Sequence, residues 1–282
     1  MLEKVDEHLL RLLVKGHSKL PKEFLYLEAG AIPIRFIISS RRLLYLQTIL
    51  KRPEEELIRR VYNAQKNDAT PGDFFNLIKE DLNLIGEQMS EEQIQHAGRD
   101  AFKREIKEKI KNAAFKYLRN IQSEHSKIRD IQYNKLETQS YLTSPIFYDE
   151  EVELLHALRS RYTNVKANFS SKFKNVMRCL LCLADRDDQQ HILSCPVLKR
   201  KLECQETVQH KNMYEDIFAD HRKQKEITYL FSRLLKIRNS LLDENLCMKA
   251  DPSTFQPRCW STVIIYIFAL FIVLSGNKSI IN

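Results

Sequence analysis

Four potential metal ligands stand close together in the last third of the chain. The stretch CLLCLADRDDQQHILSC places Cys179, Cys182, His191 and Cys195 in the pattern C-x2-C-x8-H-x3-C. A C-x2-C pair lets one tight turn present two thiolates to one ion, and three sulfurs with one imidazole form a suitable tetrahedral shell for Zn²⁺. Four protein ligands leave no position for water, so the pattern predicts a structural zinc site without metal catalysis.

The remaining cysteines and the N-terminus bear on this interpretation. Cys204 follows nine residues after Cys195 and could serve as a spare metal ligand. The alternative to a zinc site is that CLLC is a buried apolar segment whose cysteines are incidental. The N-terminal stretch MLEKVDEHLLRLLVKG lacks the unbroken apolar core of a signal peptide. We therefore expect an intracellular protein, nuclear or cytoplasmic, in which clustered cysteines bind metal rather than form disulfides.

No other pattern in the chain predicts catalysis. A glycine-rich phosphate loop, an HExxH motif and a GxSxG motif are all missing from the sequence. The other histidines are scattered, and we expect them at the surface rather than as catalytic bases: His8, His17, His96, His125, His156, His210 and His221. The sequence therefore predicts that the chain is not an enzyme.

The elements around the cysteines are expected to be helices. With only 6 glycines and 8 prolines in 282 residues, the composition favours a mainly α fold of bundle-like multi-helix domains. Pro53 is expected to open a helix with three glutamates in its first turn, and Thr70–Asp73 is expected to cap the next. Ser90 and Gln93 match the capping box.

The helix expected over 99–122 combines an apolar stripe with many basic residues. Its stripe is expected to contain Phe102, Ile106, Ile110, Ala113, Tyr117 and Ile121. Between Arg99 and Arg129 there are ten Lys or Arg against four acids, and the chain has a formal charge of +8. Either these residues form an ordinary solvated face, or Lys103, Lys107 and Lys111 contact the phosphates of RNA or DNA.

The C-terminus differs from the rest of the chain. Residues 259–277 carry no charge, and this length just reaches what a membrane span requires. Arg258 and Lys278 flank the run. The run predicts either a transmembrane helix or a buried apolar segment. The first reading supports an alternative function, a tail-anchored membrane protein with a helical cytosolic domain and no nucleic-acid role.

Several stretches, in this order, resemble the C-terminal region of LINE-like (non-LTR) retrotransposon reverse transcriptases of the restriction-like-endonuclease class. The first is LYLEAGAIPIRFIISSRRLLYLQTIL, followed by VYNAQKNDATPGDFFNLIKEDLNLIG. LTSPIFYDEEVELLHALRSRYTNVKANFSSKF then leads into the cysteine stretch. The resemblance covers about residues 20–242 and implies a polymerase thumb and linker followed by a CCHC zinc knuckle.

The resemblance also implies further site residues. By analogy, the zinc ligands carry over, and five basic residues become candidate contacts to the nucleic-acid backbone: Arg41, Arg42, Arg159, Arg161 and Lys166. The YxDD-type aspartates of the polymerase and the PD…(D/E)xK pattern of the nuclease are missing. The resemblance therefore implies a truncated, non-catalytic remnant that grips RNA or DNA with little sequence preference.

The expected organisation follows from these motifs. The predicted regions are a thumb- and linker-like part (1–90), a basic helical part (91–168), the zinc knuckle (169–204), a C-terminal helical pair (205–250) and the apolar run (259–277). The sequence makes no prediction of oligomeric state.

Overall fold

The computed structural model describes residues 2–14, 20–86, 89–163, 165, 178–183, 186–202 and 213–249. Its elements are α1 (Leu2–Leu13), α2 (Lys22–Ala29), α3 (Ile34–Leu50), α4 (Leu57–Asn67), α5 (Phe74–Leu84), α6 (Glu91–His96), α7 (Arg99–Glu124), the 3₁₀ helix η1 (Ser140–Leu142), α8 (Asp149–Arg159), α9 (Gln189–Ser194), α10 (Pro196–Lys201), α11 (Met213–Ile217) and α12 (His221–Lys249). The described residues contain no β-strand, only two isolated bridges. The prediction of a mainly α fold is confirmed.

The chain divides into two compact units, Met1–Leu235 and Lys236–Asn282. Of the second unit, the structure describes residues 236–249, the C-terminal part of α12. The predicted transmembrane run 259–277, Lys166 and Cys204 lie outside the described residues. No helix in the described part of the chain combines the length and the apolarity that crossing a bilayer requires.

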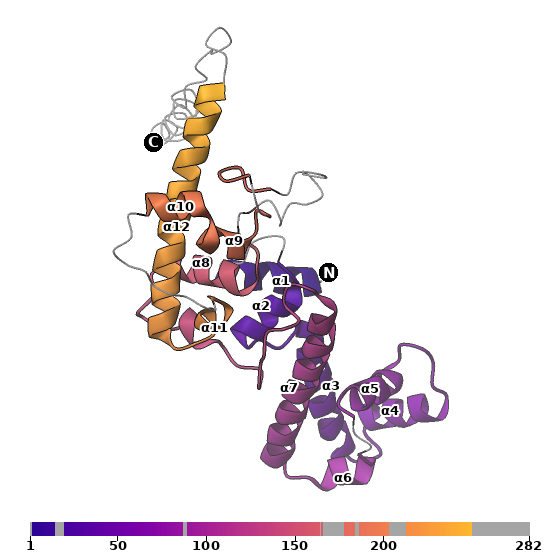
Figure 1. Cartoon of the computed structure of the whole chain (residues 1–282). Coiled ribbons are helices and arrows are strands. Elements are labelled where there is room, and N and C mark those ends of the chain that lie inside the picture. Colours follow the sequence, from indigo (N-terminus) through magenta and orange to yellow (C-terminus); the bar gives the residue numbers. More distant parts are fainter. Residues whose placement is uncertain are drawn as a thin grey trace, which may run out of the picture. The chain divides into compact units, whose positions relative to one another are not determined.

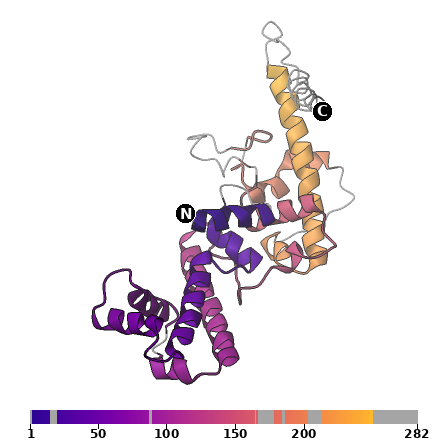
Figure 2. The same ribbon diagram turned by 180° about the vertical axis from the view of Figure 1, so that it is seen from behind.

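Helices α3 and α7 lie side by side; α5 and α6 also pack on α3, and α2 packs on α7 (Figures 1 and 2). They run antiparallel, because Arg35 near the start of α3 stacks on Tyr117 late in α7, whereas Gln47 near the end of α3 donates to the carbonyl of Ala97 just before α7. The buried apolar side chains of α3 are Phe36, Leu43, Leu46, Ile49 and Leu50. Each buried side chain of this size contributes about 1.5–3 kcal/mol to folding.

The hydrophobic core continues across the expected boundary between residues 90 and 91. It runs from Leu10 in α1 to Leu136 after α7, and includes side chains from α2 to α6. Helix α2 is buried over six successive residues, from Glu23 to Glu28. The two predicted N-terminal regions therefore share one core.

The cap signals around α4, α5 and α6 have different outcomes. Asp73 accepts a hydrogen bond from the backbone N–H of Asn76 at 2.8 Å, and Ser90 and Gln93 form a complete capping box, as predicted. The prediction of a helix beginning at Pro53 is wrong. Glu56 donates its backbone N–H to the carbonyl of Pro53 and is extended, so the glutamates precede α4 instead of forming its first turn.

The buried face of α7 differs from the expected stripe in its second half. Phe102, Ile106 and Ile110 are buried as predicted. Beyond them the buried residues are Ala114, Leu118 and Gln122, so the spacing stays at four. Four residues turn an α-helix about 40° past a full turn, and five such steps rotate the buried face by about 200°. This rotation lets one helix pack on α3 and then on α2 and the segment that follows α7.

Helix α1 keeps an apolar face at the surface. Its inward side chains are Leu10 and the following Val14. Leu2, Val5, Leu9, Leu12 and Leu13 are between 53% and 79% exposed. The helical spacing of the apolar residues correctly predicts that α1 is a helix. It does not predict how many of these residues are buried.

Candidate metal centre and basic surface

The four predicted metal ligands come together in space. One ligand atom from each of Cys179, Cys182, His191 and Cys195 lies within 4.8 Å of every other. The Sγ atoms of Cys179 and Cys195 are 4.0 Å apart, and Cys182 Sγ lies 3.3 Å from His191 Nε2. Ligands at ordinary zinc bond lengths in a tetrahedron would be roughly 3.5–3.8 Å apart, so the cluster has the dimensions of a four-ligand metal site.

Local backbone structure positions each ligand. The backbone N–H of Leu183 donates to the carbonyl of Cys179 at 2.9 Å and closes the turn that carries both thiols of the C-x2-C pair. Leu183 adopts a φ of 60°, an uncommon conformation for a bulky residue. Asp188 caps α9 by accepting from the N–H of His191 at 2.9 Å, and Cys195 is the N-cap of α10, whose first residue is a proline.

The polar environment of Cys179 suits a metal ligand. Burial raises the pKa of its thiol to about 11, while nearby backbone N–H groups act in the opposite direction. One of these is the N–H of Leu181, 3.4 Å from Sγ. A bound cation would stabilise the thiolate directly, because metal ligation favours the deprotonated form. The donor set and the spacing therefore fit a metal ion, and all four positions of a tetrahedral shell would be taken by protein.

The metal-ligand segment is attached to α8 by buried contacts. Gln189 donates to the carbonyl of Leu158 at 3.0 Å and accepts a hydrogen bond from Thr163 at 3.1 Å. Ile192 and Leu198 are each 1% exposed. The short helices α9 and α10 thus connect the ligands to the helical part of the first unit.

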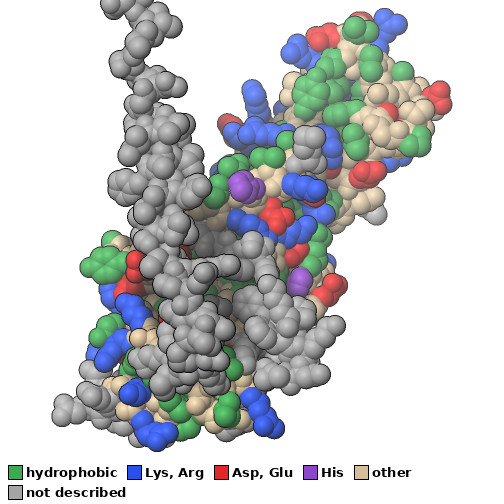
Figure 3. All heavy atoms as spheres, turned by 90° about the horizontal axis from the view of Figure 1, so that it is seen from above, with side chains coloured by type: hydrophobic (Ala, Val, Ile, Leu, Met, Phe, Trp, Pro, Cys, Tyr) green, Lys and Arg blue, Asp and Glu red, His purple; other side chains and the backbone are tan. Residues whose placement is uncertain are grey.

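The three lysines predicted on α7 lie on its outward side. Lys103 and Lys107 are exposed and Lys111 is half-buried. Among the described residues none of the three forms an ion pair, whereas Lys109 pairs with Glu105 at 2.7 Å. Arg41 on α3 is also exposed. Figure 3 shows that basic side chains are interspersed with acidic and apolar ones over the face it displays.

The predicted basic contacts Arg42, Arg159 and Arg161 are engaged within the protein. Arg42 forms two hydrogen bonds of 2.6 Å with the nearly buried carboxylate of Asp81. Arg161 is partly exposed and lies 3.6 Å from Asp130. Arg159 requires a correction, because it is only 5% exposed and faces Glu28 in the interior, not a ligand at the surface.

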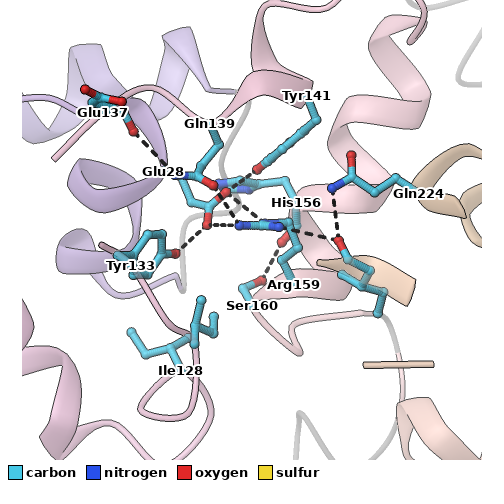
Figure 4. Close-up of polar contacts among 12 residues, drawn as sticks. Glu28, Ile128, Tyr133, Glu137, Gln139, Tyr141, His156, Arg159, Ser160 and Gln224 are labelled. Atoms are coloured by element: carbon cyan, nitrogen blue, oxygen red, sulfur yellow. Dashed lines mark hydrogen bonds and ion pairs between the residues drawn. The ribbon is translucent and has the colours of Figure 1, made fainter. Parts of the chain in front are cut away.

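The pair of Glu28 and Arg159 is the centre of a polar network that the sequence reasoning missed (Figure 4). Arg159 donates to both carboxylate oxygens of Glu28, at 3.0 and 2.9 Å. The hydroxyls of Tyr133 and Tyr141 donate to the same carboxylate. These contacts join α2, the segment after α7, η1 and α8. A signal in the sequence was Glu28 itself, a carboxylate within the otherwise apolar LYLEAG.

Charge and burial set the pKa values in this network. Burial alone would raise the pKa of Glu28, but the Arg159 guanidinium and its hydrogen bonds outweigh burial and hold the pKa below its usual value. Burial lowers the pKa of the neighbouring His156 to about 4, so its imidazole is neutral at pH 7. The ring packs 4.9 Å from that of Phe24, and the expectation of a surface histidine is wrong here.

Comparisons with family models, curated proteins and solved structures found no match to this chain. The resemblance to retrotransposon reverse transcriptases therefore stays a prediction.

Proposed function

We propose that the chain is a non-catalytic nucleic-acid-binding module whose cysteine-rich segment is held by a structural Zn²⁺ ion. The observation that carries the binding role is a row of lysines on α7 that form no ion pair with any residue the structure describes. Lys103, Lys107 and Lys111 follow at intervals of four residues, roughly 6 Å apart along the helix axis. Each of these lysines directly follows a buried residue of α7 (Phe102, Ile106 or Ile110), so the core fixes the lysine row about 100° around the helix from the buried row.

The chemistry of this row suits the sugar–phosphate backbone of RNA or DNA. A duplex carries one phosphate charge per roughly 1.7 Å of its axis, so three lysines over about 12 Å face several phosphates. Contacts of this kind position a protein on nucleic acid without reading its sequence. The lysine row therefore supports binding that weakens with rising salt and depends little on the nucleotide sequence. Such binding agrees with the resemblance to retrotransposon reverse transcriptases.

The binding role is tested by changing Lys103, Lys107 and Lys111 together to Glu. We expect the affinity for a mixed-sequence oligonucleotide to fall at least tenfold at low salt, because the phosphate contacts become repulsive. The slope of log K against log salt, measured by fluorescence anisotropy, should become shallower by about two to three.

A matched control makes the same change of charge elsewhere in the first unit. Lys4, Lys22 and Lys223 are exposed residues of α1, α2 and α12. Changing these three to Glu should weaken binding much less than the α7 change. Equal losses in the two variants would mean that net charge, not α7, governs binding, and a salt-independent wild type would contradict the proposal.

The identity of the metal is tested by elemental analysis of the purified chain. Three thiolates and one imidazole favour Zn²⁺ over Mg²⁺ or Ca²⁺, which prefer oxygen ligands. We expect one zinc per chain in the wild type and clearly less in Cys179→Ser and His191→Ala. Asp187→Asn, in the same segment but outside the four ligands, is the control that should keep its zinc.

A further inference from the structure

A cavity of about 300 Å³ lies between α3 and α5, which pack on each other within the first unit (Figure 1). Four of its lining side chains are charged, Arg35 and Arg42 from α3 and Glu80 and Asp81 from α5. Ile38 and Leu84 add apolar surface. Glu80 and Leu84 are exposed, so solvent reaches the cavity. Its volume is at the lower end of the range for ligand pockets, which leaves room for one small molecule.

Two of the four charged side chains pair with each other. Arg42 donates two hydrogen bonds of 2.6 Å to the carboxylate of Asp81, and these bonds raise the pKa of Arg42, with a smaller contribution from the charge of Glu80. Among the described residues, the side chains of Arg35 and Glu80 form no hydrogen bond and no ion pair, with each other or with a third residue. The cavity therefore holds one cationic and one anionic group whose hydrogen-bonding positions are open.

The guanidinium of Arg35 is held in place although it lacks a counterion. Its central carbon lies 3.6 Å from the centre of the Tyr117 ring and 4.9 Å from that of Phe36. A guanidinium stacked on an aromatic ring keeps the N–H groups at its edge free to donate. Because the ring already fixes the side chain, a ligand bound by Arg35 would pay little entropy for ordering it.

We propose that this cavity binds one nucleotide, with a phosphate group on Arg35 and an exocyclic amino group of the base on Glu80. A guanidinium donates two parallel hydrogen bonds to a phosphate, and a glutamate accepts from the N4 amino group of cytosine. Ile38 and Leu84 give the base an apolar contact. The site deepens the proposed function and rests on it for the class of ligand. The nucleotide can be free or part of a strand.

The charges of the cavity limit its affinity and set its preference. The two arginines and the two acids sum to zero, so the cavity as a whole does not attract anions. Specificity must come from the placement of the groups. Uracil presents the acceptor O4 where cytosine presents the N4 amino donor, so the carboxylate of Glu80 should disfavour it.

The test measures the binding of cytidine monophosphate and uridine monophosphate to the full chain by isothermal titration calorimetry at low salt. We expect saturable binding of the cytidine nucleotide, about tenfold tighter than that of the uridine nucleotide, from one hydrogen bond to a charged group. Arg35→Met should weaken both at least tenfold. Arg60→Met, which removes an exposed arginine of α4 outside the cavity, is the matched control and should bind as the wild type does.

Glu80→Gln tests the base contact without disturbing the fold, because residue 80 is exposed. A glutamine can accept from the amino group or donate to O4, so the two nucleotides should bind with similar affinity. The proposal is overturned if the wild type shows no saturable binding of cytidine monophosphate, or if Arg35→Met binds it as tightly as Arg60→Met. It is also overturned if the preference for cytidine is missing from the wild type or survives in Glu80→Gln.

The chain in which the three α7 lysines are changed to Glu separates this site from the lysine row. It should bind cytidine monophosphate as the wild type does. In this chain, binding of a short oligocytidylate that is lost with Arg35→Met assigns a nucleotide within a strand, and binding of the monophosphate alone assigns a free nucleotide. Failure of the lysine row leaves the monophosphate result intact, whereas failure of the cavity leaves salt-dependent oligonucleotide binding by the wild type.

Discussion

Glu28 and Arg159 illustrate how a single buried charge pair constrains several helices. The carboxylate is fully buried and accepts hydrogen bonds from one guanidinium and two tyrosine hydroxyls. Removing one partner of such a pair leaves the other charge buried alone, which costs more than the pair contributes in total. The intact pair therefore adds little net free energy to folding. Separating α2 from α8 would nevertheless be costly, because it would leave one buried charge without its partner.

Glu28→Gln should destabilise the first unit by about 3–5 kcal/mol at pH 7, because Arg159 would lose its counter-charge. The double variant Glu28→Gln with Arg159→Met should recover part of this loss. Urea unfolding followed by circular dichroism measures both. The account would be contradicted if the double variant lost more unfolding free energy than the two single variants lose when their losses are added.

The same carboxylate predicts a pH dependence. The pKa of Glu28 is lower in the folded protein than its ordinary value, so its contribution is fully present above that value. It is lost as pH falls through the folded pKa. The stability difference between wild type and Glu28→Gln should therefore be constant from pH 6 to 7 and shrink as the pH falls well below 4.5. A difference that grew on acidification would have the wrong sign.

At the residue scale, local patterns were predictable and distant pairs were not. The four metal ligands fall within seventeen residues, so their spacing alone predicts a common site. The partners of Glu28 are 105 to 131 residues away, and no local pattern predicts which arginine will be buried. The sequence therefore predicts a surface contact for Arg159, although the residue is buried.

At the scale of elements, the end of α2 depends on one glycine. Gly30 has a φ of 63°, and a Cβ placed there would lie 2.2 Å from the backbone nitrogen of Thr138. The neighbouring Ala29 and Thr138 form an isolated antiparallel bridge. The glycine is therefore required both by the left-handed cap and by the close approach of residues 137–138.

Gly30→Ala should lower the free energy of unfolding by more than the backbone strain of an alanine in the left-handed conformation, because the new Cβ would also clash with residues 137–138. The matched control is Gly86→Ala, which has a φ of 69° but open space around it. The control should lose about 1–2 kcal/mol from backbone strain alone, and Gly30→Ala should lose at least twice as much. Thermal unfolding of both variants measures the difference. Equal losses would mean that residues 137–138 move aside at little cost.

Helix existence and caps were predictable because they depend on residues close in sequence. Asp73 and Ser90 cap the predicted helices, and the start of α7 follows the expected apolar pattern. The second half of α7 was not predictable from periodicity, since its buried face is set by which element packs there. The Pro53 helix start failed because a hydrogen-bonded turn competes with a helical first turn.

At the scale of the whole molecule, the metal centre and the main core are separate sources of stability. The core that runs from Leu10 to Leu136 contains no side chain from residues 178–202. The short helices α9 and α10 have six residues each and few buried apolar side chains. Segments of this size depend on metal for much of their folding energy.

Chelation of the metal should therefore unfold one part of the chain and leave the other folded. In hydrogen exchange, amides of the ligand segment, such as those of Ile192 and Cys195, should lose protection after treatment with a chelator. Amides of Ile106 and Ile110 in α7 should keep theirs. Cys195→Ser without chelator should show the same pattern. A loss of protection that spread through α7 would show that metal and core fold as one unit.

The rotating buried face of α7 has a consequence for the register of the helix. Most amphipathic helices alternate steps of three and four, which keeps the apolar stripe on one side. Here the buried positions repeat strictly every four residues from Phe102 and end on Gln122, a polar residue whose amide donates to the carbonyls of Ile128 and Ile131. Inserting or removing one residue within α7 would turn every later side chain by about 100°, so the length of this helix is fixed by contacts at both of its ends.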